Sequence, residues 1–342
     1  MTQPWAWYGS DRLGLDLPPG LDVDVVEPAI PASLDDPLAA VAAALDDPLS
    51  DRTIEARAAG ASNVTIVVPD GTRVAPAEVY LLPLIARLAR VGLGPRNISV
   101  MIARGIHPAA SKAEVGRILG PQVMDALRPI QSAPNSPESN LPIGTDEELG
   151  EVRVHRLVAE SDLVVLTGSV APHHLAGFSG GPKALVPGVA DRDTVVRAHQ
   201  LTVRSVVGPD GSLRSVGGDD ATPNPFRRAL HRAVDLHGRC QLLNVVVGEG
   251  GGIAAVASGD VAPAHDAAIQ AWKQLHGRPS PEPADLVVVG VGEPRSRTLS
   301  QCHKALLAAD AWPRPGAPIV VLATSDSGPG HADLIPWFEV RD

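Results

Sequence analysis

The chain has 342 residues, of which 44% are apolar and 20% charged, so it can form two domains or one large globular domain. Its formal net charge of -10 argues against a nucleic acid or an anionic membrane as a partner, and no apolar run is long enough to span a bilayer. Residues 1–15 lack the basic and apolar regions of a signal peptide, and two cysteines, Cys240 and Cys302, are too few for a disulfide framework, which favours a cytoplasmic protein.

In chain order, the sequence predicts strands that alternate with helices. The first 30 residues alternate weakly between polar and apolar positions, which predicts two short strands in a hairpin around residues 18–20. Strands are expected at residues 63–68, 98–103, 162–167, 241–247, 285–290 and 318–323. Helices are expected at residues 38–45, 77–91, 112–119, 225–236, 262–275 and 298–309, and turn-rich loops at 132–147 and 208–224. This alternation predicts an α/β fold with mainly parallel sheets covered by helices.

A proline-rich stretch, residues 277–283 with the sequence GRPSPEP, is the clearest candidate for a linker. It would separate an N-terminal cofactor-binding and catalytic domain, residues 1–276, from a small C-terminal domain, residues 284–342. We expect the active crevice to lie between these two domains.

Polar groups follow three of the expected strands. Asp70, Thr72 and Arg73 follow one strand, His107 follows the next, and His173 follows the one after that. Since the carboxyl ends of parallel strands meet at the same edge of a sheet, these groups can converge on one crevice. A single loop histidine, or an Asp-Gly-Thr-Arg turn by itself, is more often structural. Their joint placement favours a binding site.

The densest group of reactive side chains lies in residues 168–199. This stretch contains His173, His174, a glycine-rich turn at residues 177–181 that includes Ser179, then Lys183 and His199. Only four of the 29 basic residues are lysines, so a lysine inside this motif suggests a need for a primary amine, which arginine does not supply. The segment therefore predicts a covalently attached cofactor that carries a metal.

The turn Gly177-Phe-Ser179-Gly-Gly181 also fits the G-x-S-x-G elbow of α/β hydrolases. That elbow places its serine directly after a strand, whereas here Pro172 and two histidines intervene. A serine hydrolase built on Ser179 is therefore a weaker alternative.

As a set, these motifs resemble the family of nickel-pincer-nucleotide-dependent lactate racemases, and the resemblance covers most of the chain. The motifs that carry it are Asp70-Gly-Thr-Arg73, Gly105-Ile-His107, Pro172-His173, Gly177-Phe-Ser-Gly-Gly-Pro-Lys183, His199 and Gln301-Cys-His-Lys304. The ten-residue spacing to Lys183 favours His173 over its neighbour His174 as the family's histidine.

The resemblance implies a role for each matching residue. Lys183 would bind the pyridinium pincer through a thioamide, and His199 would be the protein's ligand to a nickel ion otherwise held by two sulfur atoms and a ring carbon. His107 and His173 would be paired general acid/bases, one for each enantiomer. The remaining positions would contact the cofactor (Asp70, Thr72, Arg73, Ser179, Gly180 and Gly181) or the substrate (Arg73, Gln301 and Lys304).

The sequence also departs from the family's usual pattern. Pro108 follows the histidine where arginine is frequent, Ser132-Ala133 replaces a frequent His-Asp pair, and Pro182 precedes the lysine where many members have arginine. The chain also ends at Asp342, earlier than a typical member. We expect such changes to affect substrate recognition more than cofactor chemistry.

The resemblance implies an isomerase, a racemase or epimerase of a small 2-hydroxy acid, that works by reversible hydride transfer to the nickel-pincer nucleotide. Lactate, malate, aromatic hydroxy acids and sugar acids all remain open as substrates, and the enzymes that synthesise the cofactor are implied as partners. A member that carries the cofactor without catalysis is the main alternative.

Overall fold

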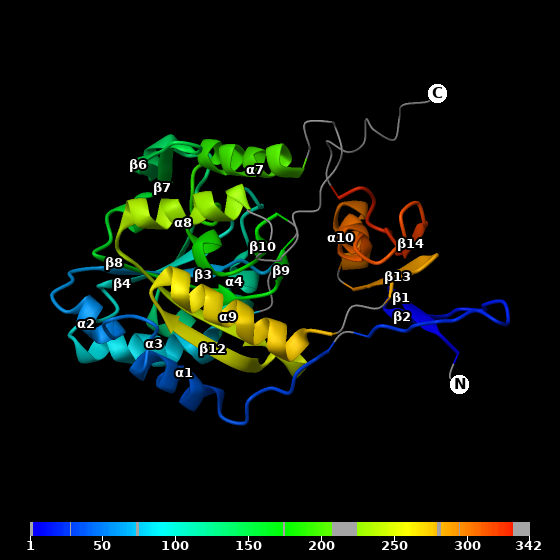
Figure 1. Ribbon diagram of the computed structural model, residues 1–342. Coiled ribbons are helices and arrows are strands. Elements are labelled where there is room, and N and C mark those ends of the chain that lie inside the picture. The colour runs from blue at the N-terminus through cyan, green and yellow to red at the C-terminus, as the bar shows by residue number, and fades with distance from the viewer. Residues whose placement is uncertain are drawn as a thin grey trace. The chain divides into compact units, whose positions relative to one another are not determined.

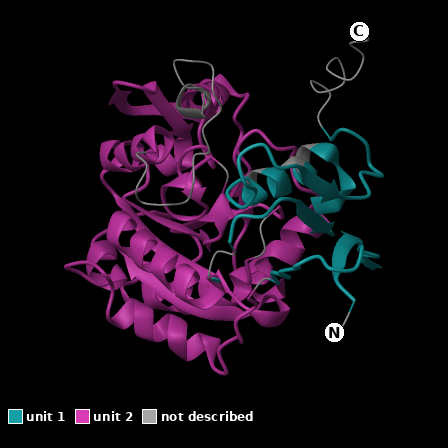
Figure 2. Cartoon of the chain, turned by 45° about the vertical axis from the view of Figure 1, so that its right-hand side comes forward, with its two compact units in different colours: residues 1–28, 278–342 teal, residues 29–277 magenta. Residues whose placement is uncertain are grey.

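The computed structural model describes residues 3–27, 29–72, 75–173, 175–206, 224–278, 282–293 and 295–330. The chain divides into two compact units, coloured separately in Figure 2. Unit 2 contains Ala29–Gly277, and unit 1 contains Met1–Pro28 together with Arg278–Asp342. The sequence assigned the first 28 residues to the N-terminal domain, whereas they fold with the C-terminal segment. Strand β1 (Trp5–Gly9) pairs in parallel with β13 (Val287–Gly292), and local sequence patterns do not reveal so distant a partner.

Unit 2 is built on a six-stranded sheet with the order β12-β11-β8-β3-β4-β5. Figure 1 labels β12, β8, β3 and β4 of this sheet. Its strands are β3 (Val64–Pro69), β4 (Ile98–Ala103), β5 (Pro129–Gln131), β8 (Leu163–Ser169), β11 (Cys240–Val247) and β12 (Ile253–Gly259). All neighbouring strands run parallel except β12, which is antiparallel to β11. The α/β fold with mainly parallel strands is therefore as the sequence predicted.

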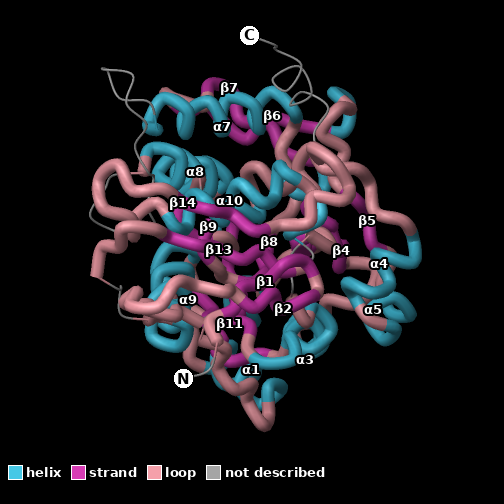
Figure 3. Tube along the Cα trace, turned by 90° about the vertical axis from the view of Figure 1, so that its right-hand side faces the viewer, coloured by secondary structure: helices cyan, strands magenta, loops and turns pink. Residues whose placement is uncertain are grey.

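Helices cover both faces of this sheet, as the cyan helices and magenta strands of Figure 3 show. Those of unit 2 are α1 (Pro37–Asp46), α2 (Ile54–Ala58), α3 (Ala77–Arg90), α4 (Lys112–Leu119), α5 (Pro121–Ala126), α6 (Arg156–Ala159), α7 (Arg192–Val206), α8 (Pro225–His237) and α9 (Val261–His276). Short 3-10 turns are η1 (Pro137–Ser139), η2 (Gly181–Ala184) and η3 (Glu249–Gly251). Successive side chains of a strand point to opposite faces of the sheet, so one strand contributes to the hydrophobic core on each face. Ile66 packs under α1 and α3, and Val67 packs on the side of α7 and α8.

Two local predictions are wrong, and one strand of the large sheet was not predicted. The N-terminal hairpin turns at residues 9–11, between β1 and β2 (Asp11–Gly14), and not around residues 18–20. Half of the expected loop at residues 132–147 is strand β6 (Asn140–Asp146), which forms a hairpin with β7 (Gly150–His155). The glycine cluster near residue 250 leads into β12, a strand that the sequence did not predict. The expected loop at residues 208–224 lies almost entirely outside the described residues.

Unit 1 has its own four-stranded sheet with the order β14-β13-β1-β2. Strand β14 (Ile319–Leu322) runs parallel to β13, and η4 (Arg295–Arg297) and helix α10 (Leu299–Ala309) connect the two. Among the residues that the structure describes, no helix is both long and apolar enough to cross a membrane.

Candidate active site

The carboxyl ends of β8, β3 and β4 lie side by side at one edge of the sheet. Strand β3 is the central one of the three, since it pairs in parallel with β8 on one side and with β4 on the other. Asp70 therefore begins the loop between the loops that carry His107 and His173. The expected shared edge is present, and it brings together loops that are up to about a hundred residues apart in the chain.

Asp70 and His107 form a direct pair across two of these loops. The Oδ2 atom of Asp70 lies 2.7 Å from Nδ1 of His107, and Oδ1 accepts hydrogen bonds from the backbone N–H of Thr72 at 3.2 Å and from its hydroxyl at 2.5 Å. Burial alone would raise the pKa of Asp70, but the hydrogen bonds from His107 and Thr72 outweigh it and hold this pKa below its ordinary value. The Asp70 side chain is thus a buried carboxylate with both oxygens engaged.

The loop of His107 is tied to the turn that carries Lys183. The backbone N–H of Gly105 donates to the carbonyl of Gly188 at 2.9 Å, and the N–H of Gly188 donates to the carbonyl of Lys183 at 3.0 Å. Arg104 stiffens the same loop, because its Nε donates to the carbonyl of Ser132 at 2.7 Å. Backbone bonds therefore fix the path of the chain at His107 and Lys183 together.

Lys183 and His199 meet at the ring of Phe226, which lies at the start of α8. Nζ of Lys183 is 5.9 Å from the centroid of this ring, and the imidazole of His199, on α7, is 5.6 Å from it. Phe226 is fully buried, so it forms a fixed apolar wall beside both side chains. Sequence patterns did not single out Phe226, because a phenylalanine at a helix start is typical of an ordinary core.

His199 is held in a state that suits a metal ligand. Its Nδ1 lies 2.8 Å from the carbonyl of Val195, to which only a protonated nitrogen can donate, so the neutral ring carries its lone pair on Nε2. Burial lowers the pKa of His199 and outweighs the hydrogen bond to Val195, which raises it; Lys183 and His107, when charged, lower it further. The imidazole therefore stays neutral, as coordination requires. In metal-binding histidines, the ring nitrogen that does not bind the metal typically donates to a partner such as a backbone carbonyl.

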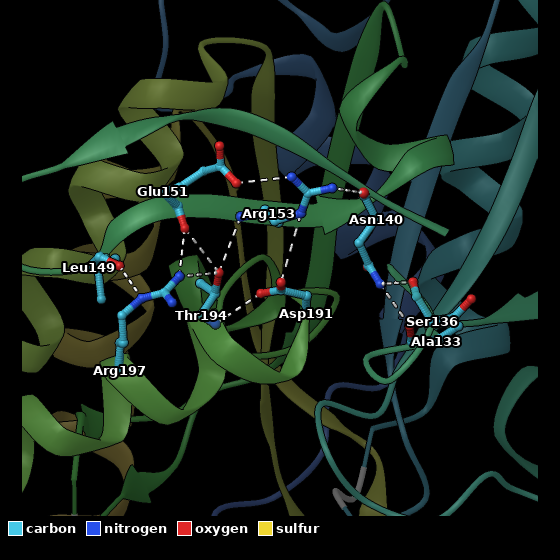
Figure 4. Close-up of polar contacts among 9 residues, drawn as sticks. All are labelled: Ala133, Ser136, Asn140, Leu149, Glu151, Arg153, Asp191, Thr194 and Arg197. Atoms are coloured by element: carbon cyan, nitrogen blue, oxygen red, sulfur yellow. Dashed lines mark hydrogen bonds and ion pairs between the residues drawn. The ribbon is translucent and has the colours of Figure 1, made fainter. Parts of the chain in front are cut away.

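Helix α7 is anchored by the β6–β7 hairpin, which the sequence did not predict (Figure 4). Arg197 donates from Nε to the carbonyl of Leu149 at 2.5 Å and from Nη2 to the carbonyl of Glu151 at 2.6 Å. Thr194 accepts at its hydroxyl from the N–H of Arg153 at 3.2 Å. These contacts lie on the turns of the helix that precede His199, so the hairpin sets the position of that side chain.

The glycine-rich turn is packed tightly against two buried polar residues. The N–H of Gly181 donates to Oδ1 of Asn244 at 2.8 Å, and Nε2 of His265 lies 3.0 Å from the carbonyl of Ser179. A Cβ on Gly180 would lie 2.6 Å from Oδ1 of Asn244, and one on Gly181 would lie 2.4 Å from the ring of His265. Protein side chains thus occupy the space that a Cβ would need. This packing requires glycine at both positions, independently of any close approach to a nucleotide. Sequence reasoning missed both Asn244 and His265.

The remaining sequence-predicted residues are placed less completely. His173 forms the short strand β9 (Pro172–His173), which pairs with β10 (Gly177–Phe178) at the start of the glycine-rich turn. Gln301 and Lys304 lie on α10 of unit 1, where Nζ of Lys304 donates to Oε1 of Gln301 at 2.7 Å. Arg73 and His174 lie outside the described residues.

Known proteins of one family resemble this chain. A family model described as the lactate racemase N-terminal domain matches residues 8–208, more than half of the chain. The chain belongs to this family. It is 25% identical over 293 residues to the lactate racemase of Thermoanaerobacterium thermosaccharolyticum and 26% identical over 303 residues to that of Lactiplantibacillus plantarum. These alignments cover 85% and 87% of this chain but 66% of each relative, so the chain spans less than two thirds of their length.

Two solved structures resemble the fold. The lactate racemase apoprotein from T. thermosaccharolyticum matches with a TM-score of 0.85 at 25% identity, over 100% of this chain and 79% of that one. A protein from Thermotoga maritima matches with a TM-score of 0.57 at 21% identity, over 75% of this chain and 64% of that one. The first match extends the likeness to lactate racemases beyond the part covered by the family model.

Ser179 has a structural role in this lactate racemase family member. It is 4% exposed, and its hydroxyl lies 3.1 Å from the carbonyl of Ser169 and 3.2 Å from that of Ala171. The hydroxyl also accepts from the N–H of Ala171 at 3.0 Å, so it fastens the turn to the end of β8. His265 contacts the carbonyl of Ser179 and not its hydroxyl. The hydroxyl is therefore poorly placed to act as the nucleophile of a hydrolase.

Proposed function

We propose that the chain is a racemase or epimerase of a small 2-hydroxy acid, with lactate as the first substrate to test. The observation that carries this proposal is the gathering of a primary amine, a neutral imidazole and an Asp–His pair at one edge of the sheet. Membership of the lactate racemase family and the match to a lactate racemase structure support it.

The residues present fit a covalently attached nickel-pincer nucleotide. Lys183 would supply the amine for the thioamide link, and His199 would supply the nickel ligand through Nε2, since its Nδ1 is bonded to Val195. The described residues contain no group of three or more His, Cys, Asp or Glu side chains able to hold a metal, so most ligands would have to come from the cofactor itself. When bound, this group would supply a hydride acceptor.

The protein's own residues would bind the hydroxy acid and move its hydroxyl proton. His107 and His173 are proposed as the acid/bases, because each follows a strand at the same edge of the sheet. Arg73, Gln301 and Lys304 are proposed to bind the substrate carboxylate through charged and amide donors. The partners proposed are the substrate and the enzymes that make the cofactor.

The test begins with the cofactor. The chain is co-expressed with cofactor-synthesis enzymes, and intact mass and nickel content are measured for the wild type, Lys183→Arg, His199→Ala and the control Lys112→Arg. Lys183→Arg keeps the positive charge but removes the primary amine, so it should abolish the adduct, whereas Lys112→Arg should keep it. His199→Ala should keep the adduct and lose nickel.

The loaded protein is then incubated with each enantiomer of lactate and of other 2-hydroxy acids, and formation of the opposite enantiomer is followed. Conversion that disappears in His107→Ala supports the proposal. An adduct with nickel but without conversion of any hydroxy acid would instead favour a protein that carries the cofactor without catalysis. A folded protein with neither adduct nor conversion would contradict both interpretations.

A further inference from the structure

The two proposed acid/base histidines are held by opposite kinds of partner. His107 presents Nδ1 to a carboxylate oxygen of Asp70 at 2.7 Å. An ionised carboxylate can only accept hydrogen bonds, so Nδ1 of His107 must carry a proton. In the neutral ring, the lone pair then lies on Nε2, which can accept a proton from a substrate hydroxyl.

His173 is held in the reverse way. Its Nδ1 accepts hydrogen bonds from the backbone N–H groups of Leu175 and Ala176, both at 3.2 Å. A backbone N–H can only donate, so Nδ1 of His173 must be bare and the neutral ring carries its proton on Nε2. Protonation of Nδ1 would break both hydrogen bonds and leave two amide donors without an acceptor.

Asp70 is itself fixed so that it cannot reverse the arrangement. The backbone N–H of Thr72 and the Thr72 hydroxyl both point to Oδ1, which leaves Oδ2 for His107. The Asp70 side chain is 11% exposed, and each of its carboxylate oxygens already has a partner within the protein. Asp70 is therefore better suited to hold His107 than to contact a cofactor or a substrate directly.

We infer that the two histidines rest in opposite tautomers, with Asp70 as the positioning residue that makes Nε2 of His107 the proton acceptor while His173 offers an Nε2 proton. This inference rests on the proposed function for its catalytic meaning. The hydroxyl proton of one enantiomer would pass to Nε2 of His107, which becomes an imidazolium paired with the Asp70 carboxylate, and no other bond to the ring changes. The enantiomer whose hydroxyl faces His173 meets a donor instead, until that ring exchanges its tautomer.

The test is nuclear magnetic resonance of the unloaded full chain labelled with ¹⁵N-histidine. Correlation of the ring nitrogens with the ring carbon-bound protons distinguishes a protonated from a bare nitrogen, at a pH well above the ordinary histidine pKa of about 6.5. Spectra of His107→Gln and His173→Gln assign the two rings by loss of their signals. We expect a bare Nε2 for His107 and a bare Nδ1 for His173.

The variant Asp70→Asn tests the cause. The N–H of Thr72 requires an oxygen opposite it, so the amide nitrogen of the asparagine should face His107 and donate to Nδ1. The bare-nitrogen signal of His107 should therefore move from Nε2 to Nδ1, while that of His173 stays. The ring signals of His276, whose two nitrogens lie against the carbonyls of Ala29 and Val247, should not change and serve as the internal reference. Glu114→Gln is the matched carboxyl-to-amide control and should leave the His107 signal unchanged.

If His107 and His173 have the same tautomer in the wild type, the inference is wrong, whether or not Asp70→Asn folds. An unchanged His107 signal in folded Asp70→Asn would remove the role of Asp70. Because the unloaded protein is used, these outcomes are independent of whether the loaded protein converts a hydroxy acid. A chain with the expected spectra but without racemisation would contradict the proposed function alone.

Discussion

Replacing Gly181 by alanine tests whether the glycine-rich turn is packed as tightly as the structure indicates. Gly181 has φ of 53°, and an added Cβ would lie 2.4 Å from Cγ and 2.5 Å from Nδ1 of His265. The imidazole has little room to move, because it is 1% exposed and its Nε2 is bonded to the carbonyl of Ser179. The positive φ costs an alanine roughly 1–2 kcal/mol, and overpacking typically adds about 1–3 kcal/mol.

Gly250 provides the matched control. It has φ of 63°, and an added Cβ would have nothing within 4 Å, so Gly250→Ala carries the backbone cost without the clash. The free energy of unfolding, measured by urea denaturation, should fall by about 1–3 kcal/mol more in Gly181→Ala than in Gly250→Ala. The double variant Gly181→Ala/His265→Ala should recover part of the difference by removing the ring. Equal losses in the two single variants would refute the packing argument.

Three further predictions concern the site and its supports. In Asp70→Asn, kcat/KM for racemisation should fall by roughly 10²–10⁴-fold and by the same factor for both enantiomers, because the equilibrium constant between mirror images is one. Burial lowers the pKa of His265 to about 3. The stability that depends on a neutral His265 is therefore present above about pH 6.5 and is lost progressively toward pH 3, by about 1.4 kcal/mol per pH unit. The difference in unfolding free energy between pH 7 and pH 5, measured by urea denaturation, should be smaller in His265→Gln than in the wild type. Arg197→Ala should cost about 1–3 kcal/mol of unfolding free energy and weaken nickel retention at His199, whereas exposed Arg192→Ala on the same helix should change stability by less than about 0.5 kcal/mol.

The sequence predicted the parts of the fold that repeat a simple rule. Parallel strands buried on both faces are continuous apolar runs, so β3, β4, β8 and β11 were recognisable from composition alone. Strand β6 contains Pro142 and Gly144 and is largely half-exposed, so its composition resembles that of a loop. The pairing of β1 with β13 depends on two segments about 280 residues apart, which no local pattern encodes.

The candidate site, like the fold, was only partly predictable from the sequence. The rule for carboxyl ends of parallel strands was sufficient to expect that Asp70 and His107 lie close together, and they are hydrogen-bonded. The rule could not identify Phe226, Asn244 or His265, which reach the site from helices and strands later in the chain. Each of these side chains is common in protein cores, so its contribution depends on what it touches and not on its type.

The buried supports explain how a site made of loops can keep a defined geometry. A turn is held in one conformation where its backbone groups have fixed hydrogen-bond partners. Here those partners are side chains that belong to helices and strands. Asn244 is on β11 and binds both the N–H of Gly181 and the carbonyl of Gly168, so it joins the turn to two strands of the sheet. Lys183 follows Gly181 by two residues. The amine proposed to hold the cofactor is therefore positioned by the sheet through Asn244, and His199, the proposed nickel ligand, is positioned by the hairpin through Arg197.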